Sequence, residues 1–455
     1  MDILLTILYF LIAIGILVLV HEFGHFITAR LSGMRTEVFA FGMGNRVFGW
    51  NKLTGFTFGS LPKDFDGGNH CDYRVAAFPI GGYVKVSGMV DESLDEQELH
   101  SEPKPWEFRS KNLFQKVLTL SGGVIMNVIL AFIIFSIMIY FNGKQYWATT
   151  TIGTVANNSI AYDLGIKPGD KILKINGKNI KTWDELALSL SINEMGKNKE
   201  IIILRNNDII KIQIDGTKLI KDLSVKKSLG IVPAEVKTLI TAVMSGKPAK
   251  SIGLQEGDTI IAINDIICTS SLDFQKAIKS NAKKRIELTW KRDNKIFKSN
   301  ITPTEEGIIG VQIADVYTGQ IIKENFGILT SLTEGIKDTY RALEMIVNSF
   351  KQLIIGNVSV KQSIGGPIAI AKMASQEANK GFLNFLNFVA LLSLMLAIIN
   401  ILPFPALDGG HLIIVIIEAI IRKEIPFKIK MAIQQVGMII LFIFMAFVIY
   451  LDITR

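Results

Sequence analysis

The stretch ILVLVHEFGHFITARLSG, residues 16–33, places a zinc-binding pattern at the end of an apolar segment. His21 and His25 are four residues apart, about 40° around an α-helix and about 6 Å along its axis, so both imidazoles can face one ion. Glu22 occupies the neighbouring position, where it can accept a proton from a water that the metal activates. Every residue from Ile3 to Val20 is uncharged, and ionisable groups in such a span are functional by default. The stretch therefore predicts a water-activating zinc site within a membrane.

Apolar residues make up 49% of the 455-residue chain, more than is usual in a soluble protein, and they are clustered. The windows without Asp, Glu, Lys, Arg or His are residues 3–20, 117–143, 381–407 and 431–451. Each approaches or exceeds the roughly 20 residues that an α-helix needs to cross about 30 Å of hydrocarbon. Because the first window follows Met-Asp instead of basic residues, we expect it to be a retained helix and not a cleaved signal peptide. These windows predict a multi-pass α-helical membrane protein with four transmembrane helices.

Basic residues predict the orientation of these helices. Those between helices one and two include Arg30, Arg35, Arg46, Lys52 and Arg74, with Arg109, Lys111 and Lys116 close to helix two, and those between helices three and four are Arg422, Lys423, Lys428 and Lys430. The positive-inside rule places both segments in the cytoplasm, so both termini and the segment 142–380 lie outside. The net charge of +8 reflects this bias, and we expect no nucleic-acid partner.

The outer segment contains an internal repeat. AYDLGIKPGDKILKINGKNI, starting at Ala161, returns as AKSIGLQEGDTIIAINDIIC, starting at Ala249. The separation between these two starts is longer than a solenoid repeat, so it indicates a duplicated domain. In each copy a Gly-Asp turn precedes an apolar β-branched strand and a polar helix, a pattern that resembles bacterial PDZ domains. We expect two inserted PDZ-like α+β domains, at residues 148–234 and 235–316.

The remaining segments flank the membrane helices, which we place at residues 1–33, 115–141, 381–421 and 431–451. Residues 34–114 alternate in polarity between glycines, which predicts short strands in a membrane-associated β-loop. Residues 325–380 should hold an amphipathic helix and a connector, and the helix places Leu332, Ile336, Leu343, Val347, Phe350 and Ile354 on one face. Such a face fits the bilayer surface or the helix bundle, and packing on the second PDZ-like domain is the alternative.

A catalytic zinc needs a third protein ligand, and NILPFPALDGGHLII, residues 400–414, offers Asp408 and His411. Helices one and three both enter from outside and reach His21 and Asp408 at similar depths, so these half-sites should meet. An unpaired aspartate there costs several kcal/mol, whereas a metal ligand is neutralised. His411, one helical turn further along, is the other candidate.

H-E-F-G-H in the first helix, L-D-G in the third and the PDZ-like pair between the second and third resemble the site-2 protease family of intramembrane zinc metalloproteases. The resemblance implies that His21, His25 and Asp408 hold one zinc ion. It makes Glu22 the catalytic base and His411 a polar contact beside the site. It also implies substrate-binding roles within NILPFP, SGGVIMN and FPIGGYVKVSG, for Asn400, Pro403, Pro405, Asn127, Gly81 and Gly82. SGGVIMN departs from the family's G-P-x-x-N motif in having Val124 where proline is usual.

The same resemblance implies cleavage of peptide bonds within the transmembrane segments of single-span proteins, such as trimmed anti-sigma factors or signal-peptide remnants, in a bacterial inner membrane. The partners are then transmembrane substrates and the lipid bilayer. We expect the PDZ-like pair to exclude untrimmed ectodomains by size, with capture of peptide termini as the alternative. Two other functions stay open. A catalytically silent PDZ scaffold has no need of the ligand set, and a protease for soluble or prenylated tails needs a cytoplasmic entrance.

Overall fold

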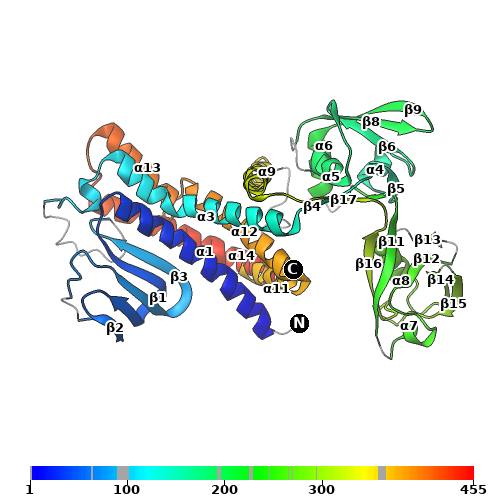
Figure 1. The fold of residues 1–455 in the computed structure, drawn as a ribbon, viewed down its shortest axis with the longest axis horizontal. Coiled ribbons are helices and arrows are strands. Elements are labelled where there is room, and N and C mark those ends of the chain that lie inside the picture. Colours follow the sequence, from blue (N-terminus) through cyan, green and yellow to red (C-terminus); the bar gives the residue numbers. More distant parts are fainter. Residues whose placement is uncertain are drawn as a thin grey trace. The chain divides into compact units, whose positions relative to one another are not determined.

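The computed structural model describes residues 3–62, 65–89, 102–191, 196–224, 229–244, 246–264, 266–268, 270–293, 295–356 and 365–454. The chain forms two compact units (Figure 1). Unit 1 comprises Met1–Gly143, Asn325–Phe350 and Ser363–Arg455, and unit 2 comprises Lys144–Glu324 and Lys351–Gln362. The predicted metal ligands all belong to unit 1, and both copies of the internal repeat belong to unit 2.

Unit 1 is built on helices that are long and apolar enough to cross a membrane. They are α1 (Ile3–Leu31), α3 (Leu113–Asn142), α12 (Phe382–Ile401) and α14 (Phe427–Ile453). Helix α3 begins with a reciprocal capping box, because the Asn112 side chain accepts from the Gln115 N–H and the Gln115 side chain accepts from the Asn112 N–H. Among the described residues, these four helices match the four predicted apolar windows in position.

The third predicted membrane segment, residues 381–421, is two helices. Helix α12 ends at Ile401 and α13 (Asp408–Ile421) starts a new helix. Pro403 and Pro405 lie between them, and because proline lacks an N–H and clashes with the preceding turn, a continuous helix cannot pass through them. The break places Asp408 in the first turn of α13.

The helices α1 and α3 approach each other closely (Figure 1). A Cβ added to Gly24 of α1 would lie 2.1 Å from the carbonyl oxygen of Gly122 on α3, so only glycine fits there. Nearer the start of α1, Leu17 shares one buried apolar cluster with Phe135 of α3 and Leu394 of α12. His21 lies between this cluster and the backbone contact at Gly24.

The β-loop is a three-stranded antiparallel sheet in the order β2-β1-β3, made of β1 (Thr36–Asn51), β2 (Gly55–Phe58) and β3 (Asp72–Val86). A 3₁₀ turn, η1 (Phe108–Ser110), precedes α3. The strands β1 and β3 are longer than the short strands expected from the glycine spacing. Gly42 and Gly44 adopt φ of 88° and 90° inside β1, so glycine bends the strand and shifts its register without ending it.

Unit 2 contains the two copies of the repeat. The first copy comprises β5 (Ile152–Val155), α4 (Ile160–Asp163), β6 (Lys171–Ile175), β7 (Lys178–Asn179), α5 (Trp183–Ser191), β8 (Lys199–Arg205), β9 (Asp208–Ile214), α6 (Gly216–Ser224) and β10 (Ile231–Pro233). The second comprises β11 (Val236–Val243), α7 (Pro248–Ser251), β12 (Thr259–Ile263), β13 (Ile266–Ile267), α8 (Ser271–Ser280), β14 (Ile286–Arg292), β15 (Lys295–Ile301) and β16 (Val311–Tyr317). The strands β4 (Lys144–Trp147) and β17 (Ile321–Glu324) pair with each other where the chain enters and leaves.

Each copy has its own core and its own sheet. The sheet of the first copy runs β7-β6-β8-β9, and that of the second runs β15-β14-β12-β11-β16, with β13 on β12. Leu186 of α5 packs in the first core and Phe274 of α8 in the second, so a helix covers the sheet in both. The strand–helix–strand order of the first copy thus returns in the second.

The amphipathic helix α9 (Ile328–Ile354) packs against α3, with a face that the apolar pattern did not predict. Its buried positions in the first four turns carry small side chains, at Ser331, Gly335, Thr339 and Ala342. A Cβ on Gly335 would lie 2.1 Å from the hydroxyl oxygen of Ser136, because α9 and α3 are in near-backbone contact. Of the predicted apolar face, Leu343 packs against the cluster that holds Phe135 of α3, whereas Ile336 is 58% exposed.

Candidate metal centre

The metal-ligand atoms come from α1 and from the first turn of α13. His21 Nε2 lies 3.3 Å from His25 Nε2, and Asp408 Oδ2 lies 3.1 Å from the former and 3.3 Å from the latter. These groups form a cluster that could hold a metal ion. The helical spacing of the histidines and the break before α13 together produce this triangle.

The triangle fits a zinc ion. Zinc bound tetrahedrally at about 2.0–2.2 Å requires ligand atoms about 3.3–3.5 Å apart, close to the observed separations. Imidazole nitrogen and carboxylate oxygen are its usual catalytic ligands. The buried Oδ2 of Asp408 accepts no well-directed hydrogen bond in the part of the chain that the structure describes, which suits an atom reserved for a metal.

Contacts behind the imidazoles fix their orientation. His25 Nδ1 donates to the backbone carbonyl oxygen of Thr119 at 2.8 Å, which leaves Nε2 free to bind a metal. A Cβ on Gly123 would lie 2.4 Å from His21 Cε1 and 2.6 Å from His25 Nε2, so α3 can approach both rings only because residue 123 is glycine. The sequence reasoning missed Thr119 because a backbone carbonyl carries no sequence signal. The contact between α1 and α3 at Gly123 was equally hidden.

The strand β3 lies beside Glu22. A Cβ on Gly82 would be 3.2 Å from Glu22 Cγ and 3.2 Å from Val18 Cγ1. Gly81 has a φ of 85° and packs against Met43. Of the glycine pair predicted to contact substrate, Gly82 therefore lies next to the predicted base, and Gly81 turns the strand.

The remaining predicted substrate residues fall in different places. The Asn400 amide lies 3.3 Å from His21 Nε2, at the end of α12, and its side chain reaches the metal centre. Pro403 is exposed in the connector after α12, and Pro405 packs against Gly437 of α14. Asn127 has no exposed surface, and its amide lies behind His21. The substrate-binding role that the resemblance implies for Asn127 stays a prediction.

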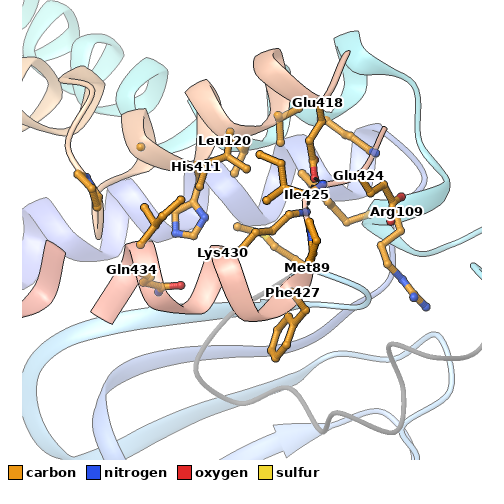
Figure 2. A pocket seen from close by; sticks show the side chains of 18 of the residues that line it. Met89, Arg109, Leu120, His411, Glu418, Glu424, Ile425, Phe427, Lys430 and Gln434 are labelled. Carbon is orange, nitrogen blue, oxygen red and sulfur yellow. Dashed lines mark hydrogen bonds and ion pairs between the residues drawn. The ribbon is translucent and has the colours of Figure 1, made fainter. Parts of the chain in front are cut away.

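His411 lies outside the ligand triangle. It lines a cavity of about 290 Å³ together with Lys116, Glu418 and Lys430. Figure 2 shows the side chains of His411, Glu418 and Lys430 around this cavity. Glu418 and Lys430 form an ion pair of 2.6 Å in this cavity. The polar-contact role expected for His411 agrees with this position.

A candidate metal centre of two histidines and an aspartate on apolar, membrane-length helices is typical of membrane-embedded zinc metalloproteases. The sequence matches the model of Peptidase family M50 over residues 9–444, and the chain belongs to that family. It is a zinc-dependent intramembrane protease of the site-2 type.

Curated relatives match along the whole chain. A Vibrio cholerae protein whose name proposes a zinc metalloprotease is 30% identical, over 100% of this chain and 99% of its own length. The regulator of sigma E protease of Haemophilus influenzae is 30% identical, and the regulator of sigma-E protease RseP of Escherichia coli is 27% identical, each over 98% of both chains. Among solved structures, the PDZ domain of an SdrC-like protein from Listeria monocytogenes is similar, with 24% identity over 17% of this chain and 85% of that chain and a TM-score of 0.16.

Proposed function

We propose that this protease hydrolyses peptide bonds within the transmembrane segments of single-span proteins whose outer domains have already been trimmed. The observation that carries the proposal is the depth of the site. His21 follows the uncharged run from Ile3 to Val20, and Asn400 lies at the end of the apolar helix α12. A metal centre reached through apolar helices serves substrates that arrive through the lipid.

The roles of the site residues follow from their positions. Zinc held by His21, His25 and Asp408 supplies a Lewis acid that polarises the scissile carbonyl and acidifies a water molecule. Glu22, adjacent to His21 on α1, takes the proton that the attacking water loses and returns it to the departing amide nitrogen.

Substrate binding requires an opened backbone, because a helical substrate satisfies and shields its own peptide groups. The strand β3 is at the edge of its sheet and passes Glu22 at Gly82, so it is placed to pair with an unwound segment. The Asn400 amide beside His21 is placed to donate a hydrogen bond to a substrate carbonyl. We assign substrate alignment to these two elements.

The orientation and the outer domains complete the proposal. From the basic residues between α1 and α3 and around the connection of α13 to α14, we infer that those segments are cytoplasmic and that unit 2 and both termini are outside. We assign two PDZ-like copies to unit 2, and we propose that they exclude substrates with folded outer domains. Equivalent ion pairs, Arg205–Asp170 in the first copy and Arg292–Asp258 in the second, support the duplication.

The test uses the purified full chain, its zinc content and a tagged single-span peptide. Glu22→Gln should keep near-stoichiometric zinc, because the ligands remain, and should lose about 10²–10⁴-fold in cleavage rate, because the base is gone. Glu377→Gln is the matched control, because Glu377 forms an ion pair with Lys380 on the surface of α11 (Pro367–Lys380). The control variant should cleave at the wild-type rate.

Turnover by Glu22→Gln at the control rate would sink the mechanism. Zinc-loaded wild-type protein that cleaves no single-span peptide would favour the scaffold function instead. A second substrate that carries a folded outer domain tests the size filter: it should be cut much more slowly than its trimmed counterpart, and equal rates would remove the filter.

A further inference from the structure

The buried side chain of Asn127 has no role in the catalytic steps above. Its amide nitrogen lies 3.2 Å from His21 Nδ1, and its amide oxygen is buried without a hydrogen-bond partner among the described residues. The Ser393 hydroxyl on α12 donates to the Asn127 backbone carbonyl at 2.8 Å. Asn127 therefore sits on α3 behind the metal ligand of α1, with its own backbone anchored to α12.

The two nitrogens of His21 have linked requirements. When Nε2 binds a metal it carries no proton, so Nδ1 carries the proton and needs an acceptor. Without a metal, Nε2 is 3.1 Å from Asp408 Oδ2, where a proton on Nε2 is favourable, and Nδ1 then needs a donor. An asparagine amide offers an oxygen acceptor and an NH₂ donor on one rotatable group.

His25 provides the contrast. Its Nδ1 faces the backbone carbonyl oxygen of Thr119, which can only accept. The tautomer of His25 is thus preset for metal binding whether or not zinc is bound. The tautomer of His21 is not fixed in this way, because the Asn127 amide beside its Nδ1 can either donate or accept a hydrogen bond.

We propose that Asn127 is a positioning residue for zinc, whose amide turns from donor to acceptor toward His21 Nδ1 when the metal binds. The proposal rests on His21 being a zinc ligand, as the proposed function requires. It is an alternative to the substrate contact expected for Asn127. It also explains the buried amide oxygen, which has no hydrogen-bond partner among the described residues: that atom is the acceptor of the zinc-bound state.

The experiment measures the zinc affinity of the full chain in detergent by competition with a chromophoric chelator. Asn127→Leu has a similar volume and no polar atom, and it should bind zinc about 10–100-fold more weakly, the usual effect of losing a partner behind a metal ligand. Asn127→Asp keeps an acceptor and loses the donor, so it should bind zinc at least as tightly as the wild type and release it more slowly. Ser136→Ala, a buried polar change two to three turns further along α3, is the matched control and should leave the affinity unchanged.

Wild-type affinity in Asn127→Leu would overturn the proposal, and so would Asn127→Asp binding zinc as weakly as the leucine variant. If the leucine variant does not fold, the comparison of Asn127→Asp with the wild type decides alone, because zinc weakened tenfold in the aspartate variant contradicts the acceptor role. These measurements need no substrate. A wild-type protein that binds zinc but cleaves nothing would therefore refute the proposed function without touching this inference.

Discussion

The carboxylates of the two units differ in what surrounds them. In unit 2, Asp170 and Asp258 have no exposed surface, and each accepts from an arginine and from a backbone N–H in its own copy of the repeat. In unit 1, Asp408 Oδ2 meets two imidazoles from a helix at the other end of the chain, and no well-directed donor among the described residues. Carboxylates whose oxygens accept hydrogen bonds from arginine and backbone N–H groups stabilise the fold, whereas a carboxylate that faces two imidazole nitrogens is placed to bind a metal together with them.

The arginine ion pairs illustrate the first kind in matching detail. Arg205 Nε lies 2.7 Å from Asp170 Oδ1, and the same guanidinium donates to the Gly165 carbonyl. In the second copy Arg292 repeats both contacts, with Asp258 and with the Gly253 carbonyl. Substitution of the arginine-paired aspartates should therefore lower stability and leave activity unchanged, whereas substitution of Asp408 should abolish activity.

The largest effect is expected at the unsaturated carboxylate. Asp408→Ala removes one of the three proposed zinc ligands, so zinc affinity should fall by more than about 100-fold and cleavage should vanish with it. His411→Ala is the matched control one turn along α13, and it should keep its zinc, because His411 lines the neighbouring cavity. Zinc content and peptide cleavage are measured on both proteins. The opposite pattern would move the third ligand to His411.

The saturated carboxylates should give the opposite result. Asp170→Ala leaves Arg205 and the Lys167 N–H without their acceptor, which should destabilise the first copy by about 2–3 kcal/mol. Cleavage of a trimmed peptide should stay at the wild-type rate, because no zinc ligand changes. Asp258→Ala makes the same change in the second copy. Denaturant unfolding gives the stability, and loss of zinc in either variant would contradict the separation.

Acid provides a further test of the same ion pair. Burial by itself raises the pKa of Asp170, but the hydrogen bonds from Arg205 and from the Lys167 N–H outweigh it and hold the pKa below its ordinary value. The stabilisation is therefore present above an unfolded pKa of about 3.9 and is lost as the pH falls through the folded pKa. Asp170→Asn cannot titrate, so its unfolding free energy should vary less with pH below about pH 4. An identical acid slope in the two proteins would show that the pair contributes nothing.

The sequence predicted those site residues that belong to a short motif or to one apolar window. His21, Glu22 and His25 follow from spacing on one helix, and Asp408 follows from its depth in the third apolar window. The repeat in unit 2 was visible because its Gly-Asp turns recur in the sequence. Each of these features can be recognised from residue types and their spacing in the sequence.

Other features depend on how helices meet, and one sequence does not reveal that. Thr119 acts through its backbone and Gly123 through a missing side chain, so neither has a recognisable motif of its own. Asn127 was assigned to substrate because the resemblance gives a position but not the direction of a side chain. The packing of α9 was only partly visible, since its small residues such as Gly335 meet α3, and of its predicted apolar face Leu343 packs inward while Ile336 is exposed.

The smallest effect is expected at Asp452, a unit 1 carboxylate that is saturated by backbone groups. Its oxygens accept from Gly366 N at 2.9 Å and from Ile368 N and Ala369 N at 3.1 Å, so the end of α14 caps the start of α11. By the comparison above it should behave like Asp170 and not like Asp408. Asp452→Ala should cost about 1 kcal/mol and raise amide exchange at the start of α11 about fivefold, while zinc content stays unchanged. Asp452→Asn, which retains a capping oxygen, should exchange like the wild type. Zinc loss in the alanine variant would contradict the comparison. It would mean that an aspartate of unit 1 affects zinc binding even when its carboxylate oxygens already accept hydrogen bonds.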